Sequence, residues 1–255
     1  MLRGAMSKLA RSLAWGVRAI AIGVALHAFG TLGLAYAVSH APNGPGAIAG
    51  DEPPPSDASG RVEKRRNAVA TQGAGYRVVL PDLRGHGHSA GGYLTYGVGD
   101  ARDVSGLLDA LEREGIDLGP VGVYGFSYGG ATALALAAIE PRVRAVVALS
   151  SFASLRGVVR DYVSWQAPWL SPAVPGAWRD SAIDAGGLWA GFDPDRAEPA
   201  ECAARSRAPI LVIHGADDPQ IPVKSAHDIG RAAGSRARLL VLPGATHASI
   251  LADRN

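Results

Sequence analysis

Gly125, Ser127 and Gly129 form a G-x-S-x-G motif at a predicted junction between a strand and a helix. The apolar residues Val121–Tyr124 precede the motif, and the small residues Gly130–Ile139 follow it. A serine in such a sharp turn is held in a strained backbone conformation that exposes its hydroxyl, and flanking glycines allow the turn to close. The N-terminus of the following helix favours a negative charge beside the serine. The pattern therefore predicts that Ser127 is a nucleophile, although the motif alone also occurs by chance in glycine-rich loops.

An acid and a histidine follow two further predicted strands. The apolar run Pro209–His214 leads into Asp217 and Asp218, and the apolar run Leu239–Leu242 leads into His247. In an open α/β sheet, the carboxyl ends of the strands are where sites form. A histidine beside a serine can take its proton, and a carboxylate can orient the imidazole ring. Serine, aspartate and histidine follow one another in an order that such sets use, so these residues are the candidate partners of Ser127.

Helices and strands alternate along the rest of the chain. The sequence predicts a helix over Arg61–Gly75, a strand over Tyr76–Leu80, a helix over Asp100–Glu114 and a strand over Ala145–Leu149. This alternation implies a mostly parallel sheet with right-handed crossovers. The predicted fold class is therefore α/β, with helices on both faces of the sheet.

Four segments together make the chain resemble the α/β-hydrolase superfamily from about Arg61 to the end. They are the Y-R-V-V-L-P-D-L-R-G-H-G-H-S stretch (Tyr76–Ser89), the serine turn, the H-G-x-x-D-x-x-I-P stretch (His214–Pro222) and Gly244–His247. The chain looks most like the branch of serine aminopeptidase-like and lysophospholipase-like enzymes. The resemblance implies a single α/β-hydrolase domain over residues 61–255.

The resemblance also implies a role for each candidate residue. By this match Ser127 attacks an acyl carbonyl, His247 is the base and Asp218 orients the histidine, with Asp217 as the competing acid. The backbone N–H of Tyr128 is the implied oxyanion donor. The implied activity is that of a serine hydrolase, which cleaves an ester, thioester or amide through an acyl-enzyme without a cofactor.

The chain departs from the family at the two ends of this domain. No V-x-x-H-G motif precedes the helix predicted at Arg61, although the loop after that motif normally supplies the second oxyanion donor. The chain also ends at Asn255, eight residues after His247, where a closing helix normally follows. The sequence therefore predicts a hydrolase that is abbreviated at both ends. The alternative to an active enzyme is a catalytically impaired remnant that lacks the second oxyanion donor.

The stretch over residues 151–208 interrupts the alternation and, by the resemblance, forms a small cap over the serine. It includes Phe152 and Phe192. It also holds four of the five tryptophans of the chain, Trp165, Trp169, Trp178 and Trp189. These aromatic side chains either line a pocket for an acyl group or bury the cap against the sheet.

The first 60 residues form a separate part of the chain. Ala19–Val38 is an apolar run of 20 residues, long enough to span a bilayer as a helix. Four basic residues and no acid precede it, which predicts that the catalytic domain lies outside the cytoplasm. Residues 1–38 are therefore expected to form a single-pass N-terminal membrane anchor, and the Pro- and Gly-rich residues 39–60 a flexible linker. The alternative is a cleaved signal peptide and a secreted protein, since Ala35–Ala37 resembles a cleavage site.

Composition and charge restrict the remaining possibilities. Hydrophobic residues make up 47% of the 255 residues, which fits a globular α/β domain. The net charge of +2 combines +4 from the first 40 residues with −2 from the rest, so no basic patch indicates nucleic-acid binding. His86 and His88 lack the further ligands of a metal site, and the single cysteine, Cys202, is expected to be inert. The expected partners are a small-molecule or lipid-like acyl substrate and, through the N-terminal segment, a membrane.

Overall fold

The computed structural model describes residues 74–251 apart from residues 88, 170–171 and 173. The expected anchor or signal segment (1–38), the linker (39–60), His88 and nearly all of the helix predicted over Arg61–Gly75 fall outside the described residues. Within the described part of the chain, no helix combines the length and the apolar character that crossing a membrane requires.

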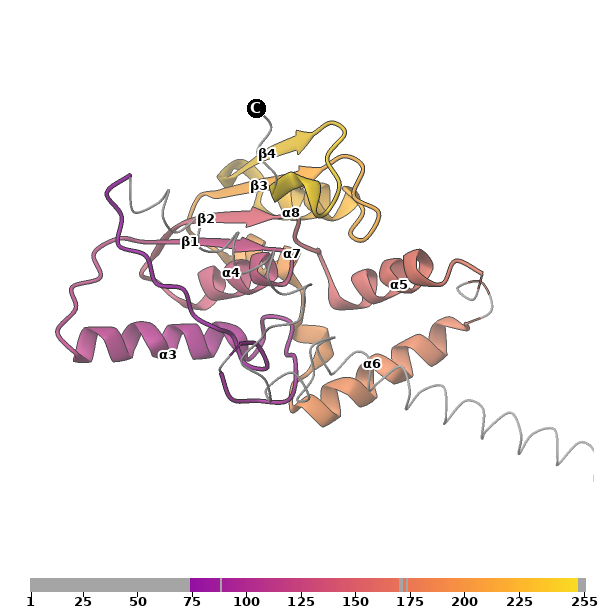
Figure 1. Cartoon of the computed structure of the whole chain (residues 1–255), viewed down its shortest axis with the longest axis horizontal. Helices are drawn as coiled ribbons and strands as arrows, with labels where there is room; N and C mark the ends of the chain where they lie inside the picture. The colour runs from indigo at the N-terminus through magenta and orange to yellow at the C-terminus, as the bar shows by residue number, and fades with distance from the viewer. Residues whose placement is uncertain (1–73, 88, 170–171, 173, 252–255) are drawn as a thin grey trace, which may run out of the picture.

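Four parallel strands form the sheet, in the order β1-β2-β3-β4 (Figure 1). Their bounds are Val121–Phe126 for β1, Val143–Leu149 for β2, Ile210–Gly215 for β3 and Ala237–Leu242 for β4. Val123 lies opposite Val146, which lies opposite Ile210, so apolar side chains form rows across the sheet. Such near-continuous apolar runs are typical of buried parallel strands. The strands predicted from Val121 onward are therefore confirmed, with bounds that shift by one or two residues.

Three helices cover one face of this sheet. They are α4 (Tyr128–Ile139), α7 (Pro199–Arg205) and α8 (Lys224–Ala233). Leu134, Leu136 and Ile229 from these helices pack with Val146 and Val212 from the strands, and each of the five is no more than 1% exposed. Helix α3 (Asp100–Arg113) packs against α4. Two turns of 3₁₀ helix, η4 (Gly234–Arg236) and η5 (Ser249–Leu251), flank β4.

No described helix packs on the opposite face of the sheet. On that face, Tyr124 of β1 is 50% exposed and Leu240 of β4 is 47% exposed. The expectation of helices on both faces is therefore met on one face only, as far as the described residues extend.

The cap consists of α5 (Leu155–Gln166) and α6 (Gly176–Ala190), which extend away from the sheet (Figure 1). Arg156 of α5 pairs with Asp184 of α6 at 2.6 Å and with Asp195 of the short helix η3 (Pro194–Arg196) at 2.8 Å. One guanidinium therefore joins all three elements at the base of the cap.

Helix α7 lies within the stretch expected to form the cap, yet it packs between α4 and α8. Its Cys202 is 5% exposed in the core beneath the sheet. Burial raises the pKa of the Cys202 thiol, which disfavours the reactive thiolate. The part of residues 151–208 that stands away from the sheet therefore ends near η3.

The prediction of a strand over Tyr76–Leu80 is wrong. This segment belongs to no strand in the structure, and Tyr76, Val79 and Leu80 are each more than half exposed (67%, 53% and 52%). An extended segment becomes a strand only when a neighbouring strand pairs with its backbone groups. Each described strand pairs only with other members of the four-stranded sheet, so Tyr76–Leu80 has no described strand beside it.

Candidate active site

Ser127 occupies the turn between β1 and α4. Its φ of 52° and ψ of −115° form a conformation that residues other than glycine rarely adopt. The Ser127 N–H donates to Leu149 O at 2.7 Å, which fixes the turn against the end of β2. A Cβ atom on Gly125 would lie 2.0 Å from Gly129 O, whereas a Cβ atom on Gly129 would meet open space. Of the two motif glycines, the turn therefore requires Gly125 and not Gly129.

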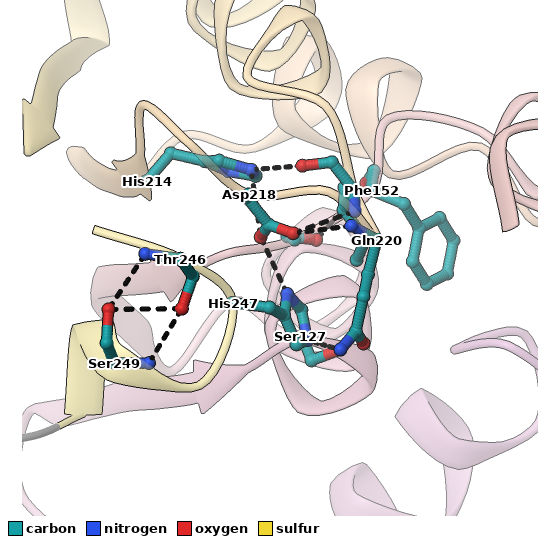
Figure 2. Close-up of polar contacts among 10 residues, drawn as sticks. Ser127, Phe152, His214, Asp218, Gln220, Thr246, His247 and Ser249 are labelled. Carbon is teal, nitrogen blue, oxygen red and sulfur yellow. Dashed lines mark hydrogen bonds and ion pairs between the residues drawn. The ribbon is translucent and has the colours of Figure 1, made fainter. Parts of the chain in front are cut away.

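His247 lies between Ser127 and Asp218 (Figure 2). Its Nε2 is 3.0 Å from Ser127 Oγ, and its Nδ1 is 2.7 Å from Asp218 Oδ2. A carboxylate oxygen only accepts hydrogen bonds, so Nδ1 carries the proton, and Nε2 of the neutral ring accepts from the serine hydroxyl. The three side chains therefore form a continuous hydrogen-bonded chain from loops that follow β1, β4 and β3.

Both carboxylate oxygens of Asp218 are held by hydrogen bonds. Oδ2 accepts from His247, and Oδ1 accepts from the backbone N–H groups of Gln220 and Ile221, each at 2.9 Å (Figure 2). Burial alone raises the pKa of Asp218, but the hydrogen bonds from His247 and Ile221 outweigh burial and hold the pKa below its ordinary value. The carboxyl group is therefore ionised at neutral pH. Asp217, the competing acid, is exposed.

His214 and Gly215 position the two loops that carry the acid and the histidine. His214 is fully buried, and its Nε2–H donates to Ile221 O at 2.8 Å, which ties together the two ends of the acid loop. Burial lowers the pKa of His214, so its ring is neutral at neutral pH. A Cβ atom on Gly215 would lie 2.3 Å from Ala245 O, so glycine lets the His247 loop approach. Sequence reasoning used this H-G pair as a motif only and missed both supporting roles.

The predicted oxyanion donor, Tyr128 N–H, is the first N–H of α4. The N–H groups of Gly130 and Ala131 donate to Ser127 O at 3.0 and 3.2 Å, whereas no described residue accepts from Tyr128 N–H. The first N–H groups of a helix have no partner inside it, so this donor is available beside the serine. The His86 ring packs beside the Tyr128 ring, with 5.3 Å between the ring centroids.

The aromatic side chains near the site fall into two groups. Phe126 lies 4.9 Å from the His247 ring, centroid to centroid, and Phe152 at the base of the cap is 3% exposed. Farther along the cap, Trp165 is 38% exposed and Trp169 is 79% exposed. Of the two alternatives given for the cap aromatics, burial holds for Phe152, which packs with Ala131 and Ile221, and does not hold for these two tryptophans.

Comparison with known proteins identifies relatives of the chain. A model of the alpha/beta hydrolase family matches residues 61–255. The chain is 30% identical over 192 residues to an uncharacterized protein of Mycobacterium tuberculosis. This match covers 75% of this chain and 60% of that protein. It is 40% identical over 119 residues to the lipase LipV of Mycobacterium tuberculosis, which covers 46% of this chain and 43% of that protein. The chain therefore spans about 60% of the length of the first of these relatives.

A solved structure has the same fold. The lipase-esterase related protein from Clostridium acetobutylicum matches with a TM-score of 0.54 at 20% identity, over 73% of this chain and 82% of that one. At this identity the likeness supports the fold and not the activity.

Proposed function

The chain belongs to the alpha/beta hydrolase family, and from that premise we propose that it is a serine hydrolase. The proposed reaction is cleavage of an ester, thioester or amide through an acyl-enzyme on Ser127. The observation that supports this proposal most directly is the hydrogen-bonded chain from Ser127 Oγ through His247 to Asp218, with distances of 3.0 and 2.7 Å. These distances lie within the reach that proton transfer requires.

In the proposed reaction, His247 Nε2 takes the hydroxyl proton as Ser127 Oγ bonds to the acyl carbon. The ionised Asp218 keeps the proton on Nδ1 and stabilises the imidazolium that forms. The imidazolium then donates its proton to the leaving oxygen, sulfur or nitrogen, and the acyl group stays on Oγ. Water, deprotonated by the same imidazole, attacks the acyl-enzyme and releases the acid.

The Tyr128 N–H would stabilise the oxyanion of each tetrahedral intermediate. It lies at the N-terminus of α4, where the helix dipole adds a positive potential. The strained backbone of Ser127 supports the same role, because strain of this kind is retained where the surrounding structure uses it.

We propose a small or lipid-like acyl ester as the substrate class. The relative at 40% identity carries the name of a lipase, although it matches less than half of this chain. The aromatic surroundings of His247 and the apolar base of the cap also favour an acyl group over a charged one.

A catalytically impaired protein is the second candidate. Among the residues that the structure describes, no strand precedes β1, so no described strand end supplies a second oxyanion donor. One such donor contributes about 10²-fold to 10³-fold to the rate. An enzyme with Tyr128 N–H alone would hydrolyse activated aryl esters, whose leaving groups are good, and would cleave amides poorly.

The experiment that separates the candidates measures how fast the full chain hydrolyses an ester, p-nitrophenyl acetate, and the corresponding amide, the p-nitroanilide of acetic acid. The proposal expects ester turnover that Ser127→Ala abolishes, together with an acetyl adduct on Ser127 in the mass spectrum of the quenched reaction. Ester turnover without measurable turnover of the amide would favour the impaired protein, and absence of both ester turnover and the adduct would contradict the proposed hydrolase.

We further propose that residues 1–38 anchor the chain in a membrane, with the catalytic domain outside the cytoplasm. The supporting observations are the 20-residue apolar run Ala19–Val38 and the basic residues that precede it. A secreted protein released by signal cleavage is the alternative.

A further inference from the structure

A buried polar cluster joins the N-termini of α3 and α4 next to Ser127. The Tyr128 hydroxyl accepts from the backbone N–H groups of Thr95 and Tyr96, at 3.0 and 2.9 Å, and donates to Asp100 Oδ2 at 2.8 Å. Tyr128 is the first residue of α4, and Asp100 is the first residue of α3. The cluster therefore holds, by hydrogen bonds, the side chain of the residue that directly follows the proposed nucleophile.

Asp100 is the centre of this cluster. It is fully buried, and its Oδ2 accepts from Thr95 Oγ1 at 2.5 Å, from Gly97 N at 3.0 Å and from the Tyr128 hydroxyl. Burial, together with the nearby Asp100, raises the pKa of Tyr128, so the phenol stays protonated and donates. Burying a carboxyl group is costly unless hydrogen bonds compensate. Because the buried carboxyl group depends on these three donors, the positions of Thr95, Gly97 and the Tyr128 hydroxyl around Asp100 are closely fixed.

We propose that Thr95, Asp100 and the Tyr128 hydroxyl are positioning residues for the oxyanion donor, Tyr128 N–H. This inference rests on the proposed serine hydrolase function. The backbone of Tyr128 is attached to Ser127 at one end, and its side chain is held at the hydroxyl by two amides and a carboxyl group. The backbone N–H of Tyr128 lies between the bond to Ser127 and the fixed side chain, so it can point in few directions. A displacement of about 1 Å at a catalytic group can reduce a rate by about 10²-fold.

The loop that donates to Tyr128 is itself held in place. Tyr96 has a positive φ of 51°, and its ring lies 6.2 Å from both Phe152 and Phe192 of the cap region. A Cβ atom on Gly97 would lie 3.3 Å from Ala131 O of α4, so the loop packs directly on that helix. The cap and α4 together thus fix the two backbone amides that donate hydrogen bonds to the Tyr128 hydroxyl.

The cluster does not contact the groups that move the proton. Asp218 and His247 lie on the loops after β3 and β4, and none of their hydrogen bonds involves Thr95, Asp100 or the Tyr128 hydroxyl. Loss of the cluster should therefore alter oxyanion stabilisation and leave the Ser127–His247–Asp218 contacts unchanged. This separation distinguishes a positioning role from a general contribution to folding.

The test compares wild type with Tyr128→Phe on the full chain, with p-nitrophenyl acetate as substrate. We expect kcat to fall about 10-fold to 10²-fold, with KM changed less than about threefold and the acid limb of the kcat/KM pH profile unmoved. Thr95→Val should show a similar but smaller loss of kcat, which Thr95→Ser restores because it keeps the hydroxyl.

Ser105→Ala is the matched control. Ser105 Oγ of α3 donates to Glu140 Oε2 at 2.8 Å, so this variant removes a hydrogen bond between α3 and the far end of α4. A wild-type kcat in Tyr128→Phe, or an equal loss of kcat in Ser105→Ala, would overturn the inference. A wild-type chain without ester turnover would instead overturn the proposed function, and the inference with it.

Discussion

His247 Nδ1 donates to Asp218 Oδ2 across 2.7 Å, whereas the adjacent Asp217 is exposed and takes no part in this contact. The two neighbouring acids therefore have distinct surroundings, and only Asp218 can orient the imidazole. We predict that Asp218→Asn keeps the fold and lowers kcat for an aryl ester by about 10⁴-fold, because the amide can hold the wrong tautomer of the ring. Circular dichroism and steady-state kinetics measure both effects.

Asp217→Asn is the control for this prediction. It removes the same charge one residue away, so it should change kcat less than about threefold, since exposed substitutions without specific contacts have small effects. A loss of activity in Asp217→Asn that matches or exceeds the loss in Asp218→Asn would contradict the assignment of the acid.

His214 should make the folded protein sensitive to mild acid. Burial lowers its pKa from the ordinary 6.5, so the folded ring stays neutral while the unfolded ring takes up a proton below that pH. Its stabilising contribution is complete above pH 6.5 and is lost as the pH falls toward the folded pKa. His214→Gln keeps a donor for Ile221 O and removes the titration.

Urea unfolding of both proteins at pH 7.5 and pH 5 measures this contribution. The difference in free energy of unfolding between wild type and His214→Gln should shift in favour of the variant at the lower pH. A difference that is the same at both pH values would show that His214 does not titrate in this way.

The N-terminal segment can be tested by fractionation. The full chain should sediment with membranes and resist alkaline extraction, and a chain that begins at Gly50 should stay in the supernatant. A mature N-terminus near Val38 in a released protein would establish signal cleavage, and a soluble full-length chain would contradict both alternatives.

The strands of the sheet were predictable because their signal is local. Val143–Leu149 and Ile210–Gly215 are apolar runs that end in turn residues, and a buried parallel strand needs little more. Tyr76–Leu80 has the same local pattern and no described partner strand. Strand formation depends on a neighbour that can be far away in sequence, so pattern alone overpredicts it.

The candidate site likewise combines residues that local sequence motifs indicate with contacts between distant residues that they do not. Ser127, Asp218 and His247 could be proposed from motifs, because each follows a predicted strand and parallel strands end at one edge. The contact of Asp100 with the Tyr128 hydroxyl joins residues 28 positions apart through side chains. Neither residue type marks such a contact in the sequence, so only the structure reveals it.

The most direct measurement of the central proposal is labelling of the full chain with a fluorophosphonate, followed by identification of the modified residue by mass spectrometry. The proposal predicts a single adduct on Ser127 that is absent in Ser127→Ala and retained in Ser151→Ala. Ser151 serves as the control because its hydroxyl is buried and donates to a backbone carbonyl. Labelling that persists in Ser127→Ala, or wild-type protein that is folded and unlabelled, would contradict the assignment of Ser127 as the nucleophile.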